Sequence, residues 1–249
     1  MGYAVRSRFS GISFGGPLLP GVKWLLILNV AVFVPFFLAR GTAAEIPFDY
    51  FKLYPSMVLH LALWQLATYL FLHASVMHVG FNMLLLWMFG GMLEGTWGTR
   101  RFLHYYFVCG IGAGVMCVIA DVLTGGSNIP TIGASGAIFG VMLAVAVLYP
   151  NQEVWVFLLF PIKLKWVVAG LAAINLLYFL KSPGVGGVSY VAHLGGLLIG
   201  YLYIKSGWLK FDVVRNAQRQ YGDWKLRRAH RKFQVYLGKR NSDRDRWVH

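Results

Sequence analysis

The feature that most constrains this chain is a series of apolar runs, each about as long as a lipid bilayer is thick. A spanning helix needs about 20 apolar residues, within a range of about 17 to 25. Six runs approach this length: 22–39, 76–93, 102–123, 132–149, 166–180 and 188–204. Only 13% of the 249 residues are charged, about half the share of a soluble domain. We therefore expect an all-α membrane protein with six spanning helices.

A further apolar segment, 53–72, is interpreted as a membrane-embedded first loop and not as a seventh span. Three residues separate it from the next run, and none of them is Gly, Pro or Asn, which would favour a hairpin turn. Pro55, His60, Trp64 and Gln65 are more typical of a partly buried segment at the membrane interface. Six spans remain the expected number.

Basic residues gather on one side of the predicted bundle. That side carries Arg6, Arg8, Lys23, Arg100, Arg101, Lys163 and Lys165, and the other side carries Arg40, Lys52 and Lys181. By the positive-inside rule, both termini are expected to be cytoplasmic. The N-terminus lacks the pattern of a cleavable signal peptide and of a transit peptide. With the size and the six-span form, this favours the inner membrane of a bacterium.

The runs divide the chain into an N-terminal cytoplasmic segment (1–21), a six-helix membrane domain (22–205) and a basic cytoplasmic tail (206–249). Residues 210–249 hold twelve Lys and Arg against four Asp and Glu. Such a tail could bind nucleic acid, but a basic segment beside a membrane is drawn to anionic lipid. We expect the lipid bilayer as the partner of the tail, and no nucleic acid.

Unusual polar residues lie at the beginnings of alternate spans. In the predicted topology, the second, fourth and sixth spans all begin on the outer side, so their N-terminal ends share one level. These ends carry His78 and Asn82, Ser135, and His193, respectively. His78 and Asn82 are four residues apart and share a helix face. The topology therefore predicts that these four side chains converge.

Together these residues could hydrolyse an amide. His193 could act as the general base for a Ser135 nucleophile. The Ser135 backbone amide, His78 and Asn82 could donate to an oxyanion. No Asp or Glu is evident beside the pair to orient the imidazole, although Asp121 stays possible in this role. A Ser–His dyad is the simpler interpretation, with Phe139 stacked on the imidazole.

Small residues make a close approach of the two helices feasible. Gly136 and Gly140 follow Ser135, and Gly196 and Gly200 follow His193. Such pairs let two membrane helices pack backbone to backbone.

Simpler roles exist for each residue taken singly. Ser and Asn in membrane helices usually form interhelical hydrogen bonds, and a His can be a proton relay or a metal ligand. A zinc site could be formed by His73, His78 and His193, but neither a His-Glu-x-x-His helix nor a carboxylate ligand supports it. We expect no metal.

Four motifs in a fixed order resemble the rhomboid family of intramembrane serine proteases over about residues 20–205. They are His73-Ala74-Ser75-Val76-Met77-His78 with Asn82, Glu94 with Gly98, Gly133-Ala134-Ser135-Gly136, and Ala192-His193 with Gly196 and Gly200. Gly-x-Ser-Gly alone is a weak signal, whereas all four on alternating helices are highly specific.

The resemblance implies an endopeptidase that cleaves single-span membrane proteins in or near their membrane segment, without a metal or cofactor. Ser135 corresponds to the nucleophile, His193 to the general base, and His78 and Asn82 to the oxyanion site. The segment 53–72 resembles the first loop of the family.

Two positions differ from the usual family pattern. Many members have Trp-Arg in the first loop, where this chain has Trp64-Gln65, and a tyrosine in the place of Phe139. Neither change removes a reacting group. A rhomboid-like pseudoenzyme that binds membrane helices would be expected to lack Ser135 or His193. A transporter would usually carry intramembrane carboxylates or inverted repeats.

Overall fold

The structure is a computed structural model that describes residues 18–125, 128–156, 160–181 and 188–206. Nearly all of the predicted N-terminal segment 1–21 and tail 206–249 therefore lies outside the described residues. Within these residues, the chain divides into a unit that ends at Leu202 and a second that begins at Tyr203. All of the candidate site residues belong to the first unit.

Apolar helices occur at all six predicted positions. They are α1 (Pro20–Ala39), the continuous stretch α5 (Val76–Leu85), η3 (Leu86–Gly90) and α6 (Gly91–Trp97), then α7 (Thr99–Leu123), α8 (Ser135–Leu148), α9 (Leu164–Lys181) and α10 (Val188–Lys205). Among the described residues, four of these stretches, α1, Val76–Trp97, α7 and α9, are long and apolar enough to cross a membrane. An all-α membrane protein is thus confirmed, and six spans stay a prediction.

As predicted, the segment 53–72 is not one long helix. The chain between α1 and α5 contains short helices only: η1 (Ala43–Glu45), α2 (Ile46–Asp49), α3 (Pro55–Leu59), α4 (Gln65–Thr68) and η2 (Tyr69–Phe71). Gln65 is fully buried among them. Its Oε1 accepts from the Tyr54 amide at 2.9 Å, and its Nε2 donates to the Tyr50 carbonyl at 3.1 Å. The amide that replaces the family's arginine therefore bonds the loop backbone on two sides.

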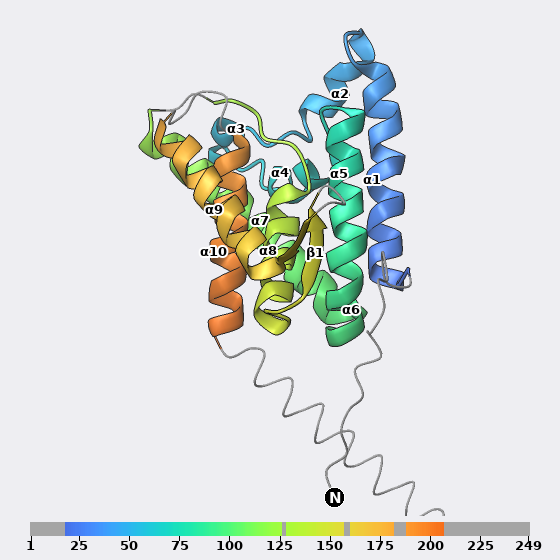
Figure 1. Cartoon of the computed structure of the whole chain (residues 1–249). Helices are drawn as coiled ribbons and strands as arrows, with labels where there is room; N and C mark the ends of the chain where they lie inside the picture. The colour runs from blue at the N-terminus through green and yellow to red at the C-terminus, as the bar shows by residue number, and fades with distance from the viewer. Residues whose placement is uncertain (1–17, 126–127, 157–159, 182–187, 207–249) are drawn as a thin grey trace, which may run out of the picture. The chain divides into compact units, whose positions relative to one another are not determined.

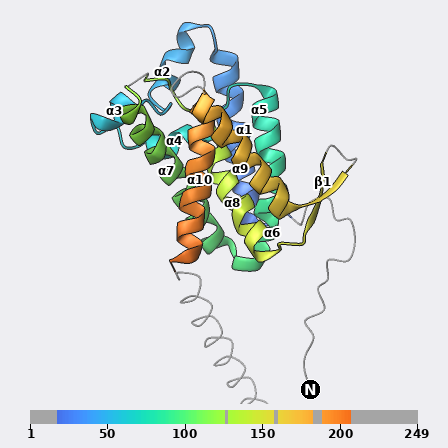
Figure 2. The same ribbon diagram turned by 60° about the vertical axis from the view of Figure 1, so that its left-hand side comes forward.

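A small antiparallel hairpin between α8 and α9 has no counterpart among the sequence predictions. Strand β1 (Glu153–Val156) pairs with β2 (Phe160–Lys163), with Glu153 opposite Lys163. In Figure 2 it projects away from the helices.

Helix α8 has neighbours on several sides. Ten of its fourteen residues are buried, and Figure 1 and Figure 2 both show α7, α9 and α10 near it. With 14 residues, α8 is only about 21 Å long, shorter than an apolar bilayer core of about 30 Å. By itself, α8 is therefore too short to cross such a core.

The N-terminus of α1 is held by a buried carboxylate. Glu94 of α6 accepts from the Gly21 and Val22 amides, both at 2.8 Å, and from Thr99 Oγ1 at 2.6 Å. Amides in the first turn of a helix have no partner within the helix, and the helix dipole favours an anion there. This family-motif residue thus connects α1, α6 and the start of α7.

Candidate active site

Ser135 is the first residue of α8, not a residue three positions inside a helix that begins at 132. Residues 132–134 are not helical, and Gly133 has a φ of +118°. A Cβ on Gly133 would also lie 2.8 Å from His78 Nε2, so both backbone conformation and space require glycine. The Ser135 amide consequently lies in the first turn of α8, where amides have no helical acceptor.

The turn before Ser135 is anchored to the first loop and to His73, the residue that follows this loop. The Gly133 amide donates to the Tyr69 carbonyl at 2.8 Å, and the Ala134 amide to His73 Nε2 at 3.4 Å. His73 is fully buried, and this burial, with His78 nearby, lowers its pKa to about 4. His73 is therefore neutral near pH 7 and can accept from the amide.

Ser135 and His193 come together. Ser135 Oγ and His193 Nε2 lie 2.7 Å apart, within hydrogen-bond reach. The two residues belong to α8 and α10, which touch through glycine. A Cβ on Gly196 would lie 1.9 Å from the Gly136 carbonyl oxygen, and one on Gly200 would lie 3.2 Å from Gly140 Cα. No larger residue at 196 leaves room for this contact.

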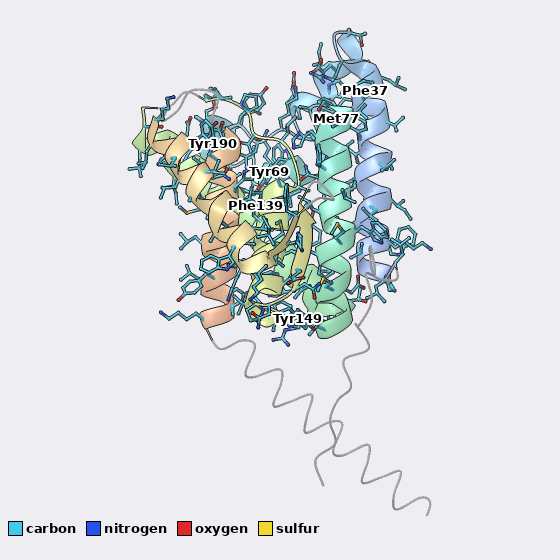
Figure 3. The ribbon with its side chains drawn as sticks, in the orientation of Figure 1. Phe37, Tyr69, Met77, Phe139, Tyr149 and Tyr190 are labelled. Carbon is cyan, nitrogen blue, oxygen red and sulfur yellow. The ribbon has the colours of Figure 1, made fainter. Side chains whose placement is uncertain are left out.

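Phe139 and His193 stack face to face. Their ring centroids are 4.1 Å apart and their planes differ by 2°. Phe139 is 9% exposed, and Figure 3 places it among the helices and not on their outer surface. The ring occupies one face of the imidazole and limits its rotation.

His78 and Asn82 both approach the turn that leads into Ser135. A Cβ on Gly133 would lie 2.8 Å from His78 Nε2 and 3.8 Å from Asn82 Nδ2. His78 Nδ1 accepts from the Ala74 amide at 3.3 Å, so its Nε2 carries the proton and is a donor. Asn82 Nδ2 is buried and has no hydrogen-bond partner among the described residues. Two donors thus face the start of α8.

A fifth polar residue, which the sequence patterns do not indicate, completes the group. Asn175 of α9 is 5% exposed, and its Oδ1 lies 2.8 Å from His193 Nδ1. The signal for it is a single asparagine in an apolar run. The carboxylate considered from the sequence, Asp121, has its Oδ1 2.9 Å from the Asn128 amide, which donates to it.

The histidines do not form a metal cluster in the part of the chain that the structure describes, where no three His, Cys, Asp or Glu side chains could hold an ion together. The His73 and His78 rings meet edge to face at 4.9 Å, while both ring nitrogens of His193 have Ser135 or Asn175 as partners.

Comparison with known proteins places these features in a family. Residues 60–209 match the model of the rhomboid domain, which is more than half of the chain and contains all five of these polar residues. The chain belongs to the rhomboid family. In this rhomboid, the motif residues His78, Asn82 and Glu94 lie on the stretch Val76–Trp97, Ser135 lies on α8 and His193 lies on α10.

Relatives of this rhomboid occur in bacteria and in mitochondria. It is 34% identical over 151 residues to the mitochondrial rhomboid protein 1 of Saccharomyces cerevisiae. This match covers 60% of this chain and 42% of the yeast protein. It is 32% identical over 160 residues to the putative rhomboid protease YdcA of Bacillus subtilis, covering 64% and 71%, respectively. The match to the rhomboid protease GluP of Bacillus subtilis is 30% identical over 139 residues and covers 55% and 25%. The chain thus spans less than half of the yeast protein and of GluP.

Proposed function

We propose that this rhomboid is a serine-type intramembrane endopeptidase. Its substrates would be membrane-anchored proteins with one spanning segment, cleaved in or near that segment. The observation that carries the proposal is the 2.7 Å contact between Ser135 Oγ and His193 Nε2. Membership of the rhomboid family, some of whose members are named proteases, supports it.

In the proposed reaction, Ser135 is the nucleophile and His193 the general base. His193 Nε2 accepts the hydroxyl proton while Ser135 Oγ adds to the carbonyl carbon of the scissile amide. The protonated imidazole then gives this proton to the leaving amine, and the C–N bond breaks. His193 then takes a proton from water, whose oxygen adds to the carbonyl carbon of the serine ester. The bond between this carbon and Ser135 Oγ breaks, and the imidazole returns the proton to Ser135 Oγ.

The oxyanion of the tetrahedral intermediate needs donors that are already in place. We assign this role to the Ser135 amide, His78 Nε2 and Asn82 Nδ2. Asn82 Nδ2 is buried and has no hydrogen-bond partner in the described part of the chain. This supports the assignment, since a buried donor without a partner is costly and is expected to have a function. Phe139 would hold the imidazole plane.

The membrane setting is part of the same proposal. We place the protein in a bacterial inner membrane with both termini in the cytoplasm, and the basic tail 206–249 beside anionic lipid. Residues 22–205 would form the catalytic membrane domain.

Reconstitution with a single-span substrate tests the proposal. The full chain in lipid vesicles should cleave the substrate, and Ser135→Ala and His193→Ala should each lower kcat at least about 1,000-fold. Ser206→Ala and His60→Ala remove an exposed serine and an exposed histidine, so these controls should keep wild-type activity. Undiminished cleavage by Ser135→Ala, or substrate binding without cleavage by the wild type, would contradict a serine protease.

A further inference from the structure

Asn175 differs from the rest of the helix that carries it. Most of α9 is exposed apolar surface, and its buried residues are Leu164, Val168 and Asn175. The spacings of four and seven residues put these three on one face of the helix. The only polar member of this buried face points at His193.

The hydrogen bonds of Asn175 define which end of its amide faces the histidine. Nδ2 donates to the Leu171 carbonyl at 2.7 Å, one turn earlier on α9. Oδ1 is then the atom that lies 2.8 Å from His193 Nδ1. A carbonyl oxygen only accepts, so the proton of this hydrogen bond has to be on Nδ1.

This proton determines the state of the other ring nitrogen. A neutral imidazole carries one proton, and with that proton on Nδ1 the Nε2 atom has a free lone pair. Nε2 faces Ser135 Oγ at 2.7 Å. The tautomer that Asn175 selects is the one that can take a proton from a serine hydroxyl.

We infer that Asn175 is a positioning residue for His193, so that the proposed dyad works as a Ser–His–Asn chain across α8, α10 and α9. This inference rests on the proposed function. Asn175 has two effects: it favours the Nδ1–H tautomer, and it holds the ring against rotation after Nε2 has gained a proton. Both effects act on the chemical step and neither on substrate binding.

The test compares isosteric variants in the full chain reconstituted in lipid vesicles with the single-span substrate. Asn175→Leu keeps the shape of the side chain but removes the acceptor, and we expect kcat to fall about 10- to 100-fold with KM within about twofold. Asn175→Asp restores an acceptor oxygen toward His193 Nδ1 but loses the donor to the Leu171 carbonyl, so it should recover part of the activity and exceed the kcat of Asn175→Leu at least about threefold. Ile174→Ala, at a neighbouring position that is 50% exposed, is the matched control and should behave as wild type.

A spectroscopic measurement reports the tautomer of His193 independently of substrate cleavage. The ring nitrogens of His193, labelled with 15N and assigned by difference from His193→Ala, should show a proton on Nδ1 in the wild type. Asn175→Leu should show a mixture of both tautomers. If Asn175→Leu does not insert, Asn175→Ala replaces it in both measurements.

The outcomes separate the inference from the proposed function. The inference would be overturned if Asn175→Leu had the kcat of Ile174→Ala while the wild type cleaved and Ser135→Ala did not. The protease proposal would stand in that case. A raised KM with unchanged kcat would also overturn it. If the wild type does not cleave, the protease proposal fails, and an unchanged tautomer in Asn175→Leu would then reject the role of Asn175 independently.

Discussion

Helices α8 and α9 both contact the helix that carries His193, but in different ways. α8 meets α10 backbone to backbone, since Gly136 and Gly196 leave no space for a Cβ between them. α9 meets α10 through side chains, with Asn175 bonded to His193 and Tyr178 stacked on Tyr190. Three of the eighteen α9 residues are buried, whereas ten of the fourteen α8 residues are.

The difference assigns separate tasks to the two contacts. A backbone contact cannot relax by a change of rotamer, so the α8–α10 contact sets the separation of Ser135 and His193. A side-chain contact acts on the imidazole itself and leaves the helix axes in place. We therefore expect changes on α8 to affect stability and activity together, and changes on α9 to affect activity or little at all.

The largest effect on stability and activity is expected for a glycine-to-alanine substitution at the α8–α10 contact, compared with the same substitution on α9. In Gly196→Ala the new Cβ would lie 1.9 Å from the Gly136 carbonyl oxygen. The two helices have to separate, which should lower the free energy of unfolding by at least about 2 kcal/mol and activity at least about 100-fold. Reversible unfolding in mixed micelles and substrate cleavage measure both.

Gly170→Ala on α9 is the matched variant. A Cβ there has nothing within 4 Å, and alanine is favoured over glycine in a helix by about 0.5 to 1 kcal/mol. It should be neutral or stabilising, with wild-type activity. Equal losses in the two glycine variants would contradict the distinction between the contacts.

Much of the α8 side could be predicted from the sequence. Small-residue pairs on two apolar runs predict a close helix contact, and the contacts of His193 with Ser135 and with Phe139 are present in the structure. The predicted start of α8 at 132 was wrong because Gly133 adopts a positive φ, and because the Gly133 and Ala134 amides donate to Tyr69 and His73 instead. Tertiary hydrogen bonds, which hydropathy does not register, make the helix begin three residues later than predicted.

The α9 side could not be predicted in the same way. The topological argument concerned helix beginnings on the outer side, whereas Asn175 lies in the second half of a helix that runs the other way. Antiparallel neighbours bring such a residue to the level of His193, although 18 positions separate the two in sequence. No motif spacing marks this pair. The β1–β2 hairpin was not predicted either, because a short connection between spans has no hydropathy signal.

Each helix also stacks an aromatic ring on α10, and the buried stack is expected to matter more. In Phe139→Leu the imidazole loses the flat face that lies 4.1 Å away. Because His193 can then rotate out of line, kcat should fall about 10-fold. Phe139→Tyr keeps the ring and serves as the control, with activity within about threefold of wild type. A kcat that is the same in both variants would show that the stack does not position the base.

The smallest effect is expected for the exposed stack on the α9 side. Tyr178 and Tyr190 lie 5.1 Å apart at an angle of 10°, and Tyr178 is 50% exposed. In Tyr178→Leu, we expect a loss of about 0.5 kcal/mol in the free energy of unfolding and cleavage within about twofold of wild type. A double-mutant cycle with Tyr190→Leu isolates the pair, and its coupling energy should not exceed about 1 kcal/mol.

The same cycle sharpens the assignment of tasks on α9. If removal of the Tyr178 ring lowered kcat as much as Asn175→Leu, α9 would act on His193 through its overall position and not through one amide. If Tyr178→Leu leaves kcat unchanged while Asn175→Leu lowers it, the contribution of α9 resides in the hydrogen bond to Nδ1. Because the two side chains are three residues apart on the same helix, this difference cannot arise from a displacement of α9 as a whole.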